Sequence, residues 1–340
     1  MSKYSKIVIS TALAGSFVAA SLMSSQPVQS AELLINNYLP PKHPFQVGVT
    51  LPWIKDVTKA TNGSVTPKLS ATKVGPPPKN WQTVTKGLAD VVLMANIFQP
   101  KRIHLPTISQ LPLGSPGALK TSIALWNTHE KFFKKANEYK GTKLVGSFVL
   151  SPNVIHSGKK PINSIADLKG FKLRAAPGIT TRILKEFGAV PVASGPSKIF
   201  GLVSKGVVDG VAVPAHGLGA FRIMPYIKYT TVIPGGLTNT SFSLLINGKK
   251  WDGLTKQQRQ QINTVSGMHV SKYLGIGDKI AAKNLAALQK AGGKVIQAGP
   301  ALMEPIKKFA AKAKAEWLQK ASAKGVDAKA AMAYFNSQLK

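Results

Sequence analysis

The chain has 340 residues, no cysteine and a formal net charge of +32, from 45 Lys and Arg against 13 Asp and Glu. The lack of cysteine excludes disulfides, thiolate metal sites and cysteine nucleophiles. With so few acidic residues, and with six histidines that show no metal-ligand spacing, we expect neither a metal site nor a cofactor.

Residues 1–31 are predicted to be a signal peptide. Lys3 and Lys6 precede an uncharged apolar run over residues 7–23, and small residues follow near the expected cleavage position. The alternative, a transmembrane anchor, is disfavoured because the run is short and rich in Ala, Ser and Gly. The sequence therefore predicts an exported protein, and the remaining residues suffice for two domains.

The first half of the mature chain predicts an α/β unit. We expect a strand at 33–36, a helix over 45–61, and a second strand at 65–69. A proline-rich loop precedes a helix over 81–86, which Asn80 is expected to cap.

One phrase, K-G-x-x-D-x-V, occurs twice, at residues 86–92 and 205–211. Each glycine suits the left-handed backbone that ends a helix, and each phrase leads into an apolar strand. The repetition predicts two lobes built on similar α/β units.

Residues 161–214 predict a β-α-β-α-β segment, with strands at 171–176, 190–192 and 207–213, of which the strand at 190–192 is expected to be buried. Such a segment forms a mainly parallel sheet, whose ligands bind at the carboxyl ends of the strands. Arg174 lies at that end, and it is one of only five arginines in the chain. Its planar guanidinium can hold a carboxylate through two hydrogen bonds.

The rest of the chain predicts one strand and several helices. The strand covers 241–246, and a Thr255–Gln258 capping box begins a long helix towards residue 290. We expect Gly267, Gly275 and Gly277 to interrupt this helix. Two amphipathic helices, 301–324 and 327–339, end the chain.

The motifs of residues 161–214, taken in order, resemble those of the solute-binding proteins of TRAP (tripartite ATP-independent periplasmic) transporters, the DctP family. The matching segments are Pro161-Ile162, Ala166 to Arg174, Gly188-Ala189-x-Pro191 and Gly206 to Gly210. The resemblance extends more weakly over the mature chain, through His43-Pro44, Leu111-Pro112 and Asn247.

The resemblance implies an α/β, two-lobed periplasmic-binding-protein-like fold, with mainly parallel sheets, a ligand cleft between the lobes and a long helix bridging both. We expect lobe I to comprise 32–150 plus 240–280, and lobe II to comprise 151–239 plus 281–340. The resemblance further implies a periplasmic protein that captures a small organic acid and delivers it to the membrane subunits of a TRAP transporter. We expect a monomer that does not bind nucleic acid.

In the family, the arginine matching Arg174 forms a salt bridge with the ligand carboxylate; the alternative is an arginine paired with a surface acid. Asn239 stands where members often place a ligand-binding asparagine, and it is equally suited to a turn. Four further residues are candidates for lining the cleft, and each could instead have an ordinary packing or structural role. They are Asn96 and Phe98 after a first-lobe strand, Trp81 beside the proline loop, and His43 in the first loop.

Several positions that are polar in the family are apolar in this chain. Val154, Val213 and Phe200 replace such residues, whereas Arg174 is retained. Because unpaired polar groups of a ligand would be unfavourable in such a pocket, we predict a monocarboxylate with an apolar or aromatic body. A polyhydroxylated sugar acid is disfavoured.

Two functions of other classes are alternatives. The high charge would suit a surface or sensory protein that binds polyanions or an anionic membrane, but the lysines are scattered singly, as on a solvated surface. Polyanion binding would weaken steeply with salt, and a closed-cleft salt bridge far less.

A hydrolase is disfavoured because G-x-S-x-G, P-loop and G-x-G-x-x-G motifs are absent, so we predict no enzymatic activity. An acidic exterior is one hypothesis for the many lysines.

Overall fold

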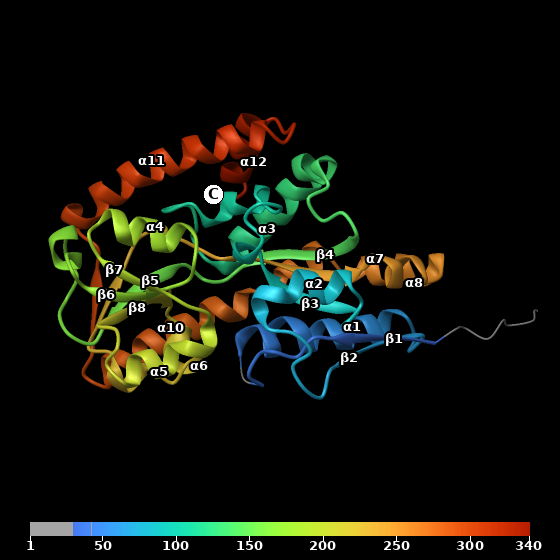
Figure 1. The fold of residues 1–340 in the computed structure, drawn as a ribbon, viewed down its shortest axis with the longest axis horizontal. Coiled ribbons are helices and arrows are strands. Elements are labelled where there is room, and N and C mark those ends of the chain that lie inside the picture. The colour runs from blue at the N-terminus through green and yellow to red at the C-terminus, as the bar shows by residue number, and fades with distance from the viewer. Residues whose placement is uncertain (1–29, 42) are drawn as a thin grey trace, which may run out of the picture.

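The computed structural model describes residues 30–41 and 43–340, which form two β-sheets with helices around them (Figure 1). The predicted signal peptide, residues 1–31, lies almost entirely outside this part of the chain. Within the described residues, no helix combines the length and the apolar character that crossing a bilayer requires.

The first sheet has five strands in the order β2-β1-β3-β10-β4. Strand β10 alone runs against the others, antiparallel to both β3 and β4, and it is the strand predicted at 241–246. Trp53 and Val57 are fully buried against this sheet. The elements of this half are β1 (Ala31–Ile35), α1 (Leu51–Ala60), β2 (Val65–Leu69), α2 (Asn80–Thr85), β3 (Val91–Ala95), α3 (Ala118–Thr128), β4 (Thr142–Val149) and β10 (Ser241–Asn247).

The second sheet has six strands in the order β11-β9-β5-β8-β6-β7. Strand β6 pairs in parallel with β7 and β8, as the β-α-β-α-β pattern predicts. Strand β7 was expected to be buried, but it is the edge strand, and Val190 is 47% exposed. The elements are β5 (Asn153–Ser157), β6 (Lys172–Ala175), α4 (Ile179–Glu186), β7 (Val190–Ala193), α5 (Ile199–Ser204), β8 (Gly210–Pro214), α6 (Gly217–Ala220), β9 (Tyr229–Val232) and β11 (Lys294–Gln297).

The chain crosses between the sheets three times, from β4 to β5, from β9 to β10 and from β10 to β11. The first two crossings run side by side, because Leu150 N donates to the carbonyl of Thr240 at 3.3 Å and Asn153 N donates to that of Thr238 at 2.9 Å. The strand that follows each of these two crossings, β5 or β10, runs antiparallel to its neighbours.

The two K-G-x-x-D-x-V phrases have the same local structure. Their first glycines have φ angles of 70° and 65°, in the left-handed region that ends a helix. The carboxylate of Asp90 accepts the N–H of Leu34 in β1 at 2.8 Å, and that of Asp209 accepts the N–H of Lys172 in β6 at 2.9 Å. Each phrase therefore ends one helix and holds the adjacent parallel strand.

The helix predicted from Thr255 to residue 290, with interruptions at Gly267, Gly275 and Gly277, is divided into three. Its capping box with Gln258 is present, but the helix stops before Gly267, whose φ is 64° and whose Cα lies against the ring of Trp126 with no room for a Cβ. The three helices are α8 (Lys256–Thr264), α9 (Met268–Lys272) and α10 (Gly275–Lys290).

Asn80 does not cap α2, contrary to the prediction. It is the first residue of that helix and is completely buried. Its amide accepts from Nδ2 of Asn36 at 2.7 Å and donates to the carbonyl of Leu93 at 2.9 Å. The side chain therefore links β1, α2 and β3.

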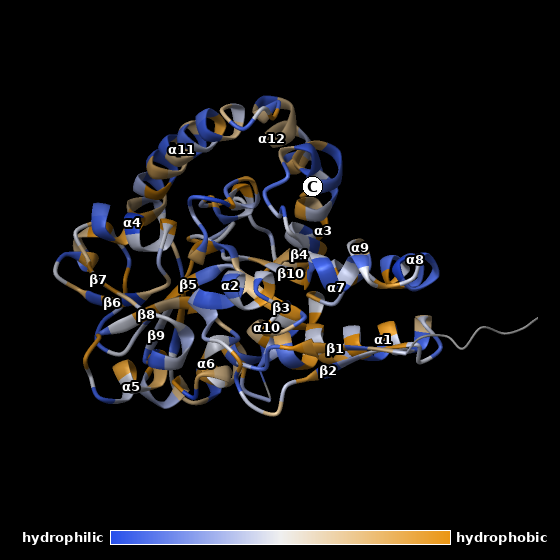
Figure 2. Ribbon diagram, turned by 45° about the vertical axis from the view of Figure 1, so that its right-hand side comes forward, coloured by the Kyte–Doolittle hydropathy of each residue, from blue (hydrophilic) through white to orange (hydrophobic). Residues whose placement is uncertain are grey.

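The C-terminal helices α11 (Pro300–Ser322) and α12 (Ala328–Ser337) contact both halves of the molecule (Figure 1). The first half of α11 packs on the second sheet through Leu302 and Phe309, and its second half packs beside α3 through Trp317. Hydrophilic and hydrophobic residues alternate along α11, as in a half-buried helix (Figure 2). The predicted lobe boundaries stay a proposal; α12 and the end of α11, assigned to lobe II, pack on residues assigned to lobe I.

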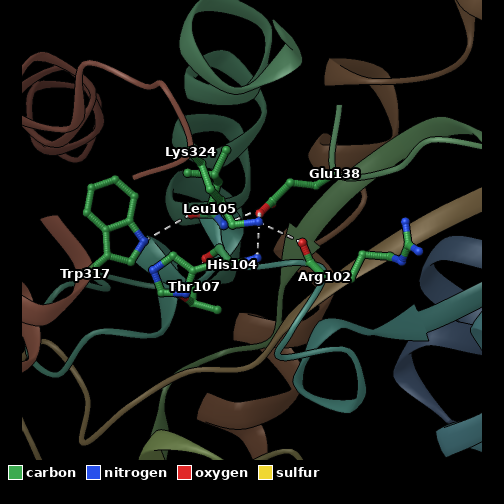
Figure 3. A network of polar contacts seen from close by, with 7 residues as sticks. All are labelled: Arg102, His104, Leu105, Thr107, Glu138, Trp317 and Lys324. Atoms are coloured by element: carbon green, nitrogen blue, oxygen red, sulfur yellow. Dashed lines mark hydrogen bonds and ion pairs between the residues drawn. The ribbon is translucent and has the colours of Figure 1, made fainter. Parts of the chain in front are cut away.

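A buried carboxylate fastens α11 to the first half of the chain (Figure 3). Glu138 accepts the N–H groups of His104 at 2.8 Å and Leu105 at 3.0 Å, and it pairs with Nζ of Lys324 at 2.8 Å. Nε1 of Trp317 donates to the carbonyl of Leu105 at 3.3 Å. These contacts hold the end of α11, and Lys324 just after it, against the first half of the chain.

Candidate ligand-binding site

A cavity of about 90 Å³ lies between the two sheets. Its walls come from loops at the carboxyl ends of β1, β3, β6 and β8, the edge where parallel sheets bind ligands. Leu150, Asn153 and Thr240 of the crossing segments also line it. The cavity therefore has walls from both halves of the chain and from the segments that join them.

Arg174 supplies the cavity with a buried positive charge. Its side chain extends from β6 and is 4% exposed. Its Nε donates to Oγ of Ser194 at 3.2 Å, and its Nη2 donates to the carbonyl of the same residue. Burial lowers the pKa of Arg174 to about 10, so the guanidinium is protonated at neutral pH.

No Asp or Glu among the described residues forms an ion pair with Arg174. The alternative of an arginine paired with a surface acid is therefore wrong. A buried charge without a counter-ion is unfavourable, and Nη1 has no hydrogen-bond acceptor in the described part of the chain. The guanidinium is thus free to take an anion from the cavity.

The other walls are mainly apolar and aromatic. Phe45 and Phe242 meet edge to face, with ring centroids 4.5 Å apart, and the ring of His43 lies 5.6 Å from that of Phe45. Tyr38, Phe98 and Phe221 also line the cavity. Such walls suit an aromatic ring, because rings pack edge to face or offset with one another.

Two histidines line the cavity and are neutral at neutral pH. Burial lowers the pKa of His43 to about 4 and that of His216 to about 3. Nδ1 of His43 accepts the N–H of Phe45 at 3.1 Å, whereas Nδ1 of His216 is buried without a partner among the described residues. Arg174 is therefore the one charged side chain in the described lining.

Of the nine predicted site residues, four line the cavity: Arg174, Phe98, Val213 and His43. Two others are displaced from it by one residue. Val154 lies inside β5, and the preceding residue, Asn153, lines the cavity, because β5 is antiparallel and begins where β8 ends. Phe200 is 47% exposed and packs on Tyr226, while Ile199 of the same helix faces the cavity.

The remaining three predicted residues have internal roles away from the lining. Trp81 belongs to a separate core cluster and has the guanidinium of Arg102 over its ring at 4.7 Å. Asn96 is bonded to Ser241 and Ser243 in β10.

Asn239 also turns away from the cavity. Its Nδ2 donates to Oγ of Ser115 at 3.1 Å, and its Oδ1 accepts the N–H of Thr240 at 2.8 Å. Both ends of the amide are thus used inside the protein, one by Ser115 before α3 and the other by the next residue of the crossing segment. Asn239 itself is not in a turn.

Sequence reasoning missed Tyr38, Ser194 and His216. Each follows a strand directly or within three residues, at the carboxyl ends of β1, β7 and β8. The rule that located Arg174 would therefore have found them if it had been applied to every parallel strand.

Another hollow, of about 510 Å³, lies beside Trp126 and Lys134. Its two carboxylates, Glu130 and Glu138, already pair with lysines, so it presents no comparable unpaired buried charge. Nor do His, Asp and Glu gather anywhere in residues 30–41 and 43–340 as a group of three that would hold a metal ion.

Residues 35–321 match the family model of the bacterial extracellular solute-binding proteins, family 7, called DctP. A curated relative, the outer membrane transporter protein TsaT of Comamonas testosteroni, is 29% identical over 322 residues, which cover 94% of this chain and 95% of the relative.

Solved structures of TRAP solute-binding proteins have the same fold. One from Bordetella bronchiseptica, with bound (R)-mandelate and (S)-mandelate, matches with a TM-score of 0.87 and 32% identity, covering 91% of this chain and 98% of that one. A marine metagenome protein specific for aromatic acid ligands, in complex with metahydroxyphenylacetate, matches with a TM-score of 0.82 and 25% identity. The match covers 91% of this chain and 98% of that one.

Proposed function

The chain belongs to family 7 of the bacterial extracellular solute-binding proteins and is a TRAP solute-binding protein, and we propose that it captures a small aromatic monocarboxylate through Arg174. Organic-acid ligands are typical of this family. The identity of the ligand and the role of the arginine are our proposal.

The observation that carries the proposal is a buried guanidinium without a counter-ion in an aromatic, otherwise uncharged cavity. A carboxylate would neutralise Arg174 and accept from its free N–H groups. An aromatic body would contact Phe45, Phe98 and Phe242. The relative from Bordetella bronchiseptica binds mandelate, an aromatic monocarboxylate of this kind.

The cavity volume of about 90 Å³ is small against the roughly 300–1,000 Å³ of common ligand pockets. We propose that the two lobes close around a ligand with a single ring. The crossing segments that line the cavity would then flex to admit and release it.

We further propose that residues 1–31 direct the chain to the periplasm and are removed there. The mature protein would act as a monomer and pass its ligand, chemically unchanged, to the TRAP membrane subunits. Recovery of altered ligand after prolonged incubation would contradict a purely binding function.

The experiment is a thermal-shift and calorimetric screen of the mature protein with matched compounds. Benzoate and mandelate are expected to bind, and at about a hundred times the dissociation constant a ligand adds about 2.7 kcal/mol of stability. Benzamide, which keeps the ring and lacks the charge, should not bind. Equal binding of benzamide, or binding of sugar acids alone, would refute the proposal.

A further inference from the structure

His216 is a buried polar side chain of the cavity that has an unused hydrogen-bonding atom. The residue is 1% exposed, and its Nδ1 has no partner among the described residues. Buried polar atoms are nearly always hydrogen-bonded, so an exception in a binding cavity points to a partner that arrives with the ligand.

The backbone of His216 is held in place by two hydrogen bonds to its carbonyl. The carbonyl of His216 accepts Nδ2 of Asn284 in α10 at 3.1 Å and the N–H of Ala220 at 3.2 Å. Position 216 therefore has a defined location at the start of α6, as a residue that reads a ligand requires.

The strand register separates His216 from Arg174 along the cavity. Arg174 is paired with Val211 in the parallel strand β8. The strand continues from Val211 to Pro214, which is roughly 10 Å at about 3.3 Å per residue, and His216 follows beyond its end. Because both residues line the same cavity, a ligand with its carboxylate on Arg174 can extend its ring towards His216.

We propose that His216 is a specificity residue that recognises a hydroxyl group on the ring of the bound aromatic acid, in the meta or para position. The inference rests on the proposed function and adds a ligand subclass to it. A hydroxyl both donates and accepts, so it satisfies Nδ1 in either tautomer of a neutral imidazole.

The chemistry of Arg174 and His216 disfavours ligands whose second polar group is anything other than a meta or para hydroxyl. Because His216 is neutral, a second carboxylate at that end of the cavity would be buried without a counter-charge. An ortho hydroxyl would lie beside the carboxylate on Arg174, away from His216. A site built to bond a hydroxyl also rejects the analogue that lacks it.

The test is calorimetric titration of the native protein and three variants with benzoate and its 2-, 3- and 4-hydroxy derivatives. The native protein should bind the 3- or the 4-hydroxy acid at least about tenfold tighter than benzoate, with no gain for the 2-hydroxy acid. His216→Leu should reduce this preference to less than about twofold, measured as the ratio of the hydroxy-acid and benzoate affinities of the same variant. His216→Asn, which retains a polar group near the position of Nδ1, should restore part of it.

His104→Leu is the matched control, because its Nε2 is also buried without a partner and it does not line the cavity. That variant should keep the native preference. A native protein that binds benzoate without favouring a hydroxy acid, or a preference that survives in His216→Leu, would overturn this inference and leave the proposed function standing. Failure of all four acids to bind would overturn both.

Discussion

Arg174 is held as a buried cation with only Ser194 as its described partner. Burial disfavours its charged form, as the lowered pKa of about 10 indicates. A buried cation without a counter-ion contributes little to the stability of the fold. The free-energy cost of burying Arg174 is explained if the residue serves ligand binding.

Replacing Arg174 should therefore separate stability from function. Arg174→Met is expected to leave the free energy of unfolding unchanged or to raise it by about 1–4 kcal/mol, because an unpaired buried charge is removed. Arg174→Lys should keep the charge but lose the planar fork, and lower benzoate affinity by roughly 10- to 100-fold. Urea unfolding and calorimetry measure the two effects.

The control is Arg182→Met, which removes an exposed arginine paired with Glu316 and should change neither quantity much. Native-like benzoate affinity in Arg174→Lys would exclude the assigned role.

At the scale of single residues, the sequence located the charged group but not its neighbours. Arg174 could be found because an arginine inside an apolar strand is unusual and matches a family motif. Phe200 and Val154 were each wrong by one position, because the face of α5 and the direction of β5 decide which side chain meets the cavity.

At the scale of elements, the repeated phrase has a physical explanation. A helix ends at the glycine, and three residues later an aspartate accepts the backbone N–H of an adjacent strand. The two lobes thus use the same short-range device, which is why it was visible in the sequence.

Asp90→Ala and Asp209→Ala should each lower the free energy of unfolding by about 1.5–3 kcal/mol, since each removes a hydrogen bond to a charged group. Asp252→Ala, on the exposed end of the short helix α7 (Gly248–Asp252), is the control and should stay within about 0.5 kcal/mol. Thermal unfolding of the three variants provides the comparison. Equal melting temperatures for all three would contradict this account of the phrase.

The helices show where local signals stop being sufficient. The capping box at Thr255 was predicted correctly because it involves neighbours in sequence. The break at Gly267 depends on the ring of Trp126, which is far away in the chain. A helical pattern alone could not reveal that contact.

At the scale of the whole molecule, the buried histidines matter more to pH stability than the lysines do. Burial lowers the pKa of five histidines, to about 4 for His43, His104 and His129 and to about 3 for His156 and His216. In the unfolded chain their pKa is about 6.5. Below that pH the unfolded state binds more protons than the folded state, so stability falls as the pH falls.

His156 and His216 are completely buried, and each should reduce the free energy of unfolding by about 2 kcal/mol between pH 6.5 and pH 5. Urea unfolding at pH 7, 6 and 5 measures this loss, and His156→Gln should show a shallower dependence. The same free energy at pH 7 and pH 5 would contradict the prediction. A loss of this size would also argue against an acidic exterior as the reason for the many lysines.

The sequence by itself determined the family, the α/β class with its two repeated units, and the arginine available to bind a carboxylate. These depend on capping residues, glycine conformations and strand patterns, all of which act between near neighbours in the chain. The fold class and the family are confirmed. Only the tertiary structure decided that Asn153, Ile199 and His216 line the cavity, that Trp126 lies against the helix break at Gly267, and that α11 contacts both halves. Those features arise where distant segments pack together, and which side chains then meet depends on strand direction, helix face and the room left beside a glycine.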